Sequence, residues 1–157
     1  MTLSQSVLDA AKKQNISIST AESCTGGLVI AALTDVAGAS AVVERGFVTY
    51  TNAAKTEMLG VSEETLAAFG AVSQEVAAEM ATGALTRSHA GLAISITGIA
   101  GPGGSEFKPE GRVCFGLAQT GQPVATETVE FGALGRDRVR LSARDHALQL
   151  VLDRLAE

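Results

Sequence analysis

Aromatic residues are scarce in this sequence, and tryptophan is absent. Only 4% of the 157 residues are aromatic, although 46% are hydrophobic. Small apolar side chains, alanine above all, must therefore form most of the core, which favours closely packed helices and strands and argues against a large aromatic recognition surface. The length suits one domain, residues 1–157, that buries roughly 70% of its unfolded surface.

Cysteine and histidine are also rare. Cys24 and Cys114 lie far apart with no C-x-x-C spacing, and the only histidines are His89 and His146. This pattern argues against a structural zinc site and gives no support to a disulfide framework. We therefore expect a protein that works without a metal ion or another cofactor.

An excess of positive charge is lacking as well, since 12 Lys and Arg stand against 17 Asp and Glu, for a net charge of -5. Binding to nucleic acid or to an anionic membrane needs a cationic surface, so neither partner is expected. No apolar run reaches the roughly 18 residues of a membrane span, and the N-terminus has no basic segment followed by an apolar one. We expect a cytoplasmic protein.

What the sequence does contain is a regular succession of strand and helix patterns, which predicts an α/β fold. Helices are expected at about 3–14, 25–36, 52–59, 63–69, 73–88 and 134–155, and strands at 16–20, 41–51, 91–97, 112–120 and 124–131. Asn52, Ser62 and Ser73 are the expected N-caps of three helices, and Arg45–Gly46 is an expected bulge. The first two strands should be parallel, whereas the last two should form an antiparallel hairpin. The whole predicts three layers, α/β/α, around a mixed sheet.

Polar and glycine residues gather after three of the predicted strands. Ser23 and Cys24 follow the first strand, Tyr50 to Lys55 follow the second, and Thr97 to Gly104 follow the third. In sheets with crossover helices, ligands bind beyond the carboxyl ends of the parallel strands. We therefore expect the three segments to share one site.

Ser23 lies in the stretch TAESCTGGLV, between a predicted strand and a predicted helix. Its hydroxyl is a candidate nucleophile, and the first N–H groups of the helix, around Cys24 to Gly27, could bind a phosphate or an oxyanion. The alternative is a plain helix cap, in which Ser23 or Thr25 bonds the first turn. Cys24 is a rival nucleophile, because a thiolate is intrinsically more reactive, but it lacks an obvious histidine base.

Lys55 is the candidate general base, as the only lysine between Lys13 and Lys108. Near a helix N-terminus the macrodipole favours loss of its proton, which would bring its pKa down from about 10.4 toward the range of a general base. The alternative is an ordinary exposed lysine on a helix surface.

Two further segments have both a functional and an ordinary interpretation. The glycine-rich loop TGIAGPGG, with Gly98 and Gly101, could form a nest for an anion, although its spacing matches neither a Walker nor a dinucleotide motif. Arg136 and Arg140 lie one helical turn apart, either as a phosphate or carboxylate clamp or as a solvated face paired with aspartates. The residues alone predict an anion-binding amide or ester hydrolase with a Ser/Lys pair, and nothing more specific.

Six segments in order along the chain resemble the C-terminal domain of the competence-damage protein CinA: AESCTGG, GFVTYTNAAK, LGV, FGAVSQEVAAEMATGA, TGIAGPGG with KPEG, and GRDRVR. Stand-alone members of that family are nicotinamide-nucleotide amidases. The resemblance therefore implies hydrolysis of the carboxamide of nicotinamide mononucleotide to nicotinate mononucleotide and ammonia, in pyridine-nucleotide salvage. The alternative is a non-catalytic nucleotide-binding or regulatory module of the same family.

The resemblance also implies roles for individual residues. Ser23 corresponds to the nucleophile and Lys55 to the general base, with Tyr50 assisting the pair. Together with the backbone groups considered above, the residues expected to line the site or bind substrate are Cys24, Thr25, Gly26, Gly27, Ser40, Thr97, Gly98, Gly101, Arg136 and Arg140. Glu110 in KPEG, where a small apolar residue is expected, and Ala53 depart from the family pattern. Ala-rich helices and an unpaired hairpin edge favour a homodimer.

Overall fold

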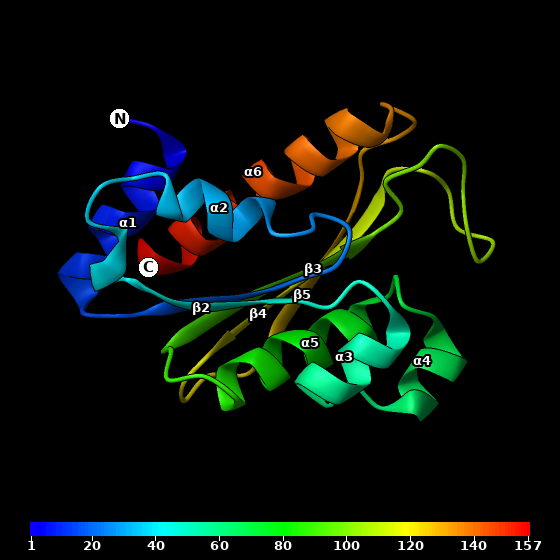
Figure 1. Cartoon of the computed structure of the whole chain (residues 1–157), viewed down its shortest axis with the longest axis horizontal. Coiled ribbons are helices and arrows are strands. Elements are labelled where there is room, and N and C mark those ends of the chain that lie inside the picture. The colour runs from blue at the N-terminus through cyan, green and yellow to red at the C-terminus, as the bar shows by residue number, and fades with distance from the viewer.

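A five-stranded sheet lies between two layers of helices in the computed structural model, which describes all residues 1–157 (Figure 1). The strands are β1 (Ile18–Glu22), β2 (Val43–Val48), β3 (Leu92–Gly98), β4 (Arg112–Gln119) and β5 (Ala125–Glu130), in the spatial order β2-β1-β3-β4-β5. β1 is parallel to β2 and β3, whereas β3, β4 and β5 pair antiparallel in turn. The predicted mixed sheet, the parallel first pair and the hairpin are confirmed.

Helices cover both faces of the sheet, which confirms the predicted three layers (Figure 1). One layer holds α1 (Leu3–Gln14), α2 (Leu28–Thr34) and α6 (Arg136–Leu155), and the other holds α3 (Asn52–Leu59), α4 (Glu63–Phe69) and α5 (Gln74–Thr86). The larger apolar cluster lies under the first layer, and a smaller one, which includes Met80, lies under the second. None of the helices is both long and apolar enough to cross a bilayer.

β1 begins and ends two residues later than the predicted strand. Asn15 ends α1 in the left-handed conformation, and the N–H of Ile16 still bonds back to Ala11 O at 3.0 Å. Strand pairing therefore starts only at Ile18. All five residues of β1 are buried, including its three polar ones. The alternation of apolar and polar residues does not mark an exposed face here, because helices cover both faces.

α2 begins at Leu28, three residues after the predicted start at Thr25. Gly26 and Gly27 have φ angles of +59° and +108°, which belong to a tight turn and not to a right-handed helix. The N–H of Gly26 closes this turn by donating to Ser23 O at 3.1 Å. The residues after Ser23 therefore form a turn that precedes the helix, and α2 is also shorter than expected at its other end.

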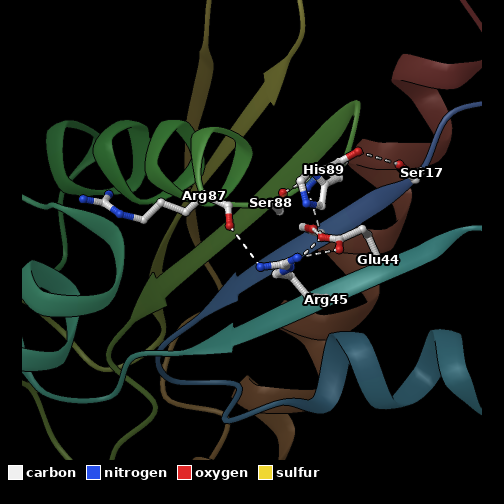
Figure 2. A network of polar contacts seen from close by, with 8 residues as sticks. Ser17, Glu44, Arg45, Arg87, Ser88 and His89 are labelled. Atoms are coloured by element: carbon white, nitrogen blue, oxygen red, sulfur yellow. Dashed lines mark hydrogen bonds and ion pairs between the residues drawn. The ribbon is translucent and has the colours of Figure 1, made fainter.

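β2 begins later than predicted, because a 3₁₀ turn, η1 (Ala39–Ala41), precedes it, and it also ends earlier, at Val48. Its register against β1 skips Glu44, so the bulge lies there and not at the predicted Arg45–Gly46. The Glu44 carboxylate accepts from Arg45 Nε at 2.7 Å and from the backbone N–H of His89 at 3.2 Å, while Arg45 also donates to Arg87 O (Figure 2). This network ties the sheet edge to the loop before β3, at the amino ends of the parallel strands.

Side-chain caps fix where the helices of the second layer begin. Thr51 caps α3, since its Oγ1 accepts from the N–H of Ala54 at 3.1 Å, and the predicted cap, Asn52, is instead the first helical residue. The predicted caps Ser62 and Ser73 are confirmed, because each hydroxyl accepts from N–H groups of the first turn of α4 or α5. The caps set the point at which α3 leaves β2, and so the position of Lys55.

Candidate active site

The carboxyl ends of β1, β2 and β3 surround a cavity of about 240 Å³. The segments that follow all three strands contribute to its wall, so the three polar segments expected to share a site do meet. The lining residues are Ser23, Cys24, Tyr50, Asn52, Lys55, Ala71, Val72, Thr97, Gly98, Ile99, Ala100, Ser105, Glu106 and Arg136. A larger cavity of about 620 Å³ lies between α1, α2 and α6, and no serine–lysine pair lines it.

Ser23 and Lys55 come together inside this cavity. Ser23 directly follows β1, and its N–H donates to Ile96 O of β3 at 2.9 Å, so its backbone continues the sheet. Lys55 lies in the first turn of α3, and its Nζ is 3.0 Å from Ser23 Oγ. Ser23 is 8% exposed and Lys55 only 1%. Neither ordinary interpretation fits, because Ser23 caps no helix and Lys55 is not a surface lysine.

Two carbonyl groups hold the Lys55 amine on its other sides. Nζ donates to Thr49 O at 3.0 Å and to Tyr50 O at 3.1 Å. A neutral amine has two N–H groups and one lone pair. When the two N–H groups point at the carbonyls, the lone pair faces Ser23 Oγ, so the geometry allows Lys55 to accept the hydroxyl proton.

Burial keeps the Lys55 amine from holding its proton as tightly as a lysine in water. It lowers the pKa of Lys55 below the ordinary value of 10.5, while the neighbouring acidic groups of Cys24 and Glu106 oppose this shift. No ion pair compensates the charge of Lys55. Desolvation is therefore the main cause of the lowered pKa, in place of the helix macrodipole invoked from the sequence.

Cys24 is buried beside the pair, with only 6% of its surface exposed. Burial raises the pKa of its thiol from 9.0 to about 12, and the positive charges of Lys55 and Arg140 offset this only in part. A thiol with such a pKa is protonated near neutral pH, and the thiolate is the nucleophilic form. Cys24 therefore acts in the structure as a small apolar side chain.

Backbone donors near Ser23 are fewer than the sequence suggested. The N–H of Gly26 donates to Ser23 O, and that of Gly27 donates to Glu22 Oε1 at 3.2 Å. The expectation that these two glycines offer free donors is therefore wrong. The N–H groups of Cys24 and Thr25 donate to no other residue of the chain. They are the groups available to an oxygen that develops negative charge beside Ser23.

Glu22, to which the sequence analysis gave no role, holds the turn in place. Its carboxylate is completely buried and accepts hydrogen bonds from Thr25 Oγ1 at 2.6 Å, from the N–H of Val29 at 3.0 Å and from that of Ile30 at 3.0 Å. The N-terminal amides of α2 are thus already satisfied by a carboxylate of the chain itself. The helix N-terminus consequently is not the anion site that the sequence suggested.

The two arginines expected to bind substrate have different surroundings. Arg140 donates from Nε to Cys24 O at 3.0 Å and from Nη2 to Thr25 O at 3.3 Å, so it fixes the turn after Ser23 and does not line the cavity. Arg136 does line the cavity, and it donates from Nη1 to Gly101 O at 2.7 Å and from Nη2 to Tyr50 Oη at 3.1 Å. Arg136 is the cationic side chain at the exposed side of the cavity.

The remaining predicted site residues differ in whether they reach the cavity: Tyr50 and Thr97 do, and Ser40 does not. Tyr50 contacts Lys55 through its carbonyl, while its hydroxyl accepts from Arg136. Thr97 lines the cavity and donates to Ala71 O at 2.8 Å, which joins β3 to the segment before α5. Ser40 does not reach the cavity: it lies in η1, before β2, at the opposite end of the sheet. Its predicted position is wrong for this chain, because the strand that follows it runs the length of the sheet before reaching the site.

The glycine-rich loop is held by Glu110, the residue that departs from the family pattern. Its carboxylate accepts from the N–H of Gly103 at 2.7 Å and from that of Gly135, the N-cap of α6, at 3.1 Å. Gly98 lines the cavity, whereas Gly101 contributes its carbonyl to Arg136 and does not line it. The loop is therefore tied to the helix that carries both arginines.

Sequence reasoning missed Asn52, Ser105 and Glu106 as lining residues. Asn52 was taken for a cap, and the other two lie in a loop whose path no periodicity predicts. For Glu22 a signal existed: a carboxylate at the end of a strand that helices are expected to cover, immediately before the candidate nucleophile, requires buried partners.

The fold and the site together define an α/β protein with a serine hydroxyl and a buried lysine amine at the carboxyl ends of its parallel strands. The chain belongs to the CinA C-terminal domain family, whose model matches residues 1–155. This confirms the resemblance inferred from the six sequence segments.

Individual relatives agree with this assignment. The chain is 53% identical over 150 residues to "Nicotinamide-nucleotide amidohydrolase PncC" of Escherichia coli K12, covering 95% of this chain and 90% of that protein. It is 52% identical over 151 residues to the protein of the same name from Shigella flexneri, with 95% and 90% covered. Among solved structures, the competence/damage inducible protein CihA from Agrobacterium tumefaciens superposes with a TM-score of 0.94 at 48% identity, covering 99% of this chain and 94% of that one.

Proposed function

We propose that this protein is a nicotinamide-nucleotide amidase, which hydrolyses the carboxamide of nicotinamide mononucleotide to nicotinate mononucleotide and ammonia in pyridine-nucleotide salvage. The observation that carries the proposal is the 3.0 Å contact between Ser23 Oγ and the buried amine of Lys55. The names of the relatives from Escherichia coli and Shigella flexneri support the choice of substrate.

The first half of the proposed reaction forms an acyl-enzyme. Neutral Lys55 takes the proton of Ser23 as Oγ attacks the amide carbon, and the N–H groups of Cys24 and Thr25 stabilise the oxyanion. Such donors contribute about 3 to 4 kcal/mol each in other enzymes. The amide C–N bond then breaks, and the Lys55 ammonium gives its proton to the departing nitrogen, which leaves as ammonia.

The second half returns the enzyme to its starting state. Lys55, neutral again, takes a proton from water as the water oxygen attacks the acyl carbon. The ester C–O bond breaks, Ser23 Oγ recovers a proton from Lys55, and the carboxylic acid product is released. In this scheme Tyr50 assists through its carbonyl, which orients the amine.

Arg136 is the proposed contact for the ribose phosphate, because it is the cationic group on the exposed side of the cavity. Its guanidinium already has a fixed direction, since Gly101 O and Tyr50 Oη accept from it. The cavity of about 240 Å³ lies just below the range of roughly 300 to 1,000 Å³ for small-molecule sites. We therefore assign the cavity to the nicotinamide part and its outer edge to the phosphate.

A comparison of three amides tests the proposal. Ammonia release is measured with nicotinamide mononucleotide, free nicotinamide and glutamine under the same conditions. The proposal predicts turnover of the mononucleotide and little of the other two. Binding of the mononucleotide without release of ammonia would favour the alternative, a non-catalytic nucleotide-binding module.

A homodimer and a cytoplasmic location complete the proposal. Both edge strands, β2 and β5, lack a second partner strand within the chain, which leaves backbone groups free for pairing with another copy. Light scattering at two protein concentrations tests the dimer, and a mass of one chain at both concentrations would contradict it.

A further inference from the structure

The cavity carries one negative side chain whose role the proposed reaction leaves open. Among the lining residues, Glu106 is the sole carboxylate and Arg136 the sole arginine. Glu106 forms no ion pair within the chain, and the nearest lysine along the sequence, Lys108, donates instead to the carbonyls of Phe69 and Val72. The Glu106 carboxylate lies beside Gly70, near the Lys108 ammonium but without a hydrogen bond or ion pair to it, and so remains available to a ligand.

The backbone holds Glu106 at the edge of the cavity. Ser105 and Lys108 exchange two backbone hydrogen bonds of 2.9 and 2.8 Å, which close a two-residue turn. Both central residues have positive φ, 53° for Glu106 and 63° for Phe107. Both residues are exposed to solvent, and of the two only Glu106 lines the cavity. Because Lys108 anchors the turn to the segment before α5, the position of Glu106 is set by the fold.

The charge of Glu106 also reaches the reacting pair. Its negative charge raises the pKa of Lys55, against the larger lowering caused by burial. Unit charges attract or repel appreciably over several ångströms in a partly desolvated site. A charged ligand group held against Ser23 and Lys55 therefore lies within the field of Glu106.

The proposed substrate brings a positive charge to this place. In a nicotinamide nucleotide the ring nitrogen is bonded to ribose, so the oxidised ring is a permanent cation, whereas the reduced dihydropyridine ring is neutral. The amide carbon is attached to the same ring, so the cation must enter the cavity when Ser23 reaches that carbon. The phosphate carries the opposite charge and faces Arg136. The two charges of the ligand thus match Glu106 and Arg136.

We propose that Glu106 selects the oxidised, cationic form of the nicotinamide nucleotide over the reduced, neutral form. This inference rests on the proposed function, because it takes its ligand from that reaction. It assigns to a loop residue the discrimination between two nucleotides that have the same carboxamide, ribose and phosphate.

Binding measurements in a Ser23→Ala background separate this inference from turnover. Calorimetry compares oxidised and reduced nicotinamide mononucleotide, first in Ser23→Ala and then in Ser23→Ala/Glu106→Gln. We expect the oxidised form to bind about tenfold more tightly to the first protein, and this preference to fall to about twofold or less in the second. A matched control, Ser23→Ala/Glu64→Gln, removes an exposed carboxylate of α4 outside the cavity and should keep the preference.

Each other outcome overturns the inference. An equal loss of affinity for both forms would assign Glu106 to the ribose hydroxyls, and an unchanged preference would place the discrimination elsewhere. If neither form binds, the proposed ligand is wrong and the inference fails with it. Ammonia release by the unmodified protein is measured separately, so turnover without an oxidised-form preference refutes this inference alone, and no turnover refutes the proposed function.

Discussion

Replacing Lys55 by methionine should change how the stability of the protein depends on pH. Lys55 is 1% exposed, and burial lowers its pKa below 10.5. Between the lowered pKa and the unfolded value near 10.5, the folded chain therefore binds one proton fewer than the unfolded chain at this residue. The free energy of unfolding then rises with pH, by about 1.4 kcal/mol per pH unit.

The slope isolates the titration of Lys55 from other effects of the substitution. Lys55→Met leaves the carbonyls of Thr49 and Tyr50 without the Nζ donor, which costs a similar amount at every pH. Titrating groups that do not interact with Lys55 are present in both proteins and cancel in the difference. The pH dependence of the difference between the two free energies of unfolding therefore reports the titration of Lys55.

The assay is urea denaturation of both proteins from pH 6 to pH 11, a range that includes the unfolded value of the Lys55 pKa. We expect the unmodified protein to gain stability relative to Lys55→Met as the pH rises above the folded pKa, with the slope given above. Below the folded pKa the difference should become constant, because both states then hold the proton. Parallel curves over the whole range would refute the reasoning, since Lys55 would then titrate alike in the folded and unfolded chains.

Three further predictions concern the turn around Ser23 and the arginine at the edge of the cavity. Glu22→Gln places an amide against backbone donors and should cost about 2 to 4 kcal/mol, measured as a loss of about 5 to 15 °C in Tm. An unchanged Tm would contradict the role of Glu22 in holding the turn. Arg140→Met should lower kcat about tenfold or more with little change in KM, whereas Arg136→Met should mainly raise KM. If Arg140→Met instead raised KM and Arg136→Met lowered kcat, the roles assigned to the two arginines would be exchanged. Cys24, with a thiol pKa of about 12, should resist iodoacetamide at pH 8 until the protein is unfolded, and rapid labelling of the folded protein would show it to be reactive.

The sequence predicted the architecture well because the layers follow from periodicity. Apolar residues at helical spacing and short apolar runs place the elements in order, and the three-layer sheet follows from their alternation. Boundaries were less accurate where a local bond decides them. Thr51 caps α3 in place of Asn52, and positive φ at Gly26 and Gly27 delays α2 to Leu28.

The pairing of Ser23 with Lys55 needed more than local pattern. Each residue taken alone had an ordinary interpretation, and only the rule that parallel strand ends share one edge suggested that they meet. The burial that lowers the pKa of Lys55 depends on the tertiary fold, so no local signal carries it. For Arg140, the helical spacing from Arg136 was predicted correctly. The backbone carbonyls that Arg140 contacts could not be inferred from that spacing.

The central claim is that Ser23 attacks the carboxamide with Lys55 as its base. The most direct test is the rate of ammonia release from nicotinamide mononucleotide by the unmodified protein, Ser23→Ala and Cys24→Ala, each checked for an unchanged fold by circular dichroism. We predict a loss of about 10⁴-fold or more in Ser23→Ala and near-normal turnover in Cys24→Ala. Near-normal turnover in Ser23→Ala, with loss in Cys24→Ala, would contradict the account and assign the attack to the thiol.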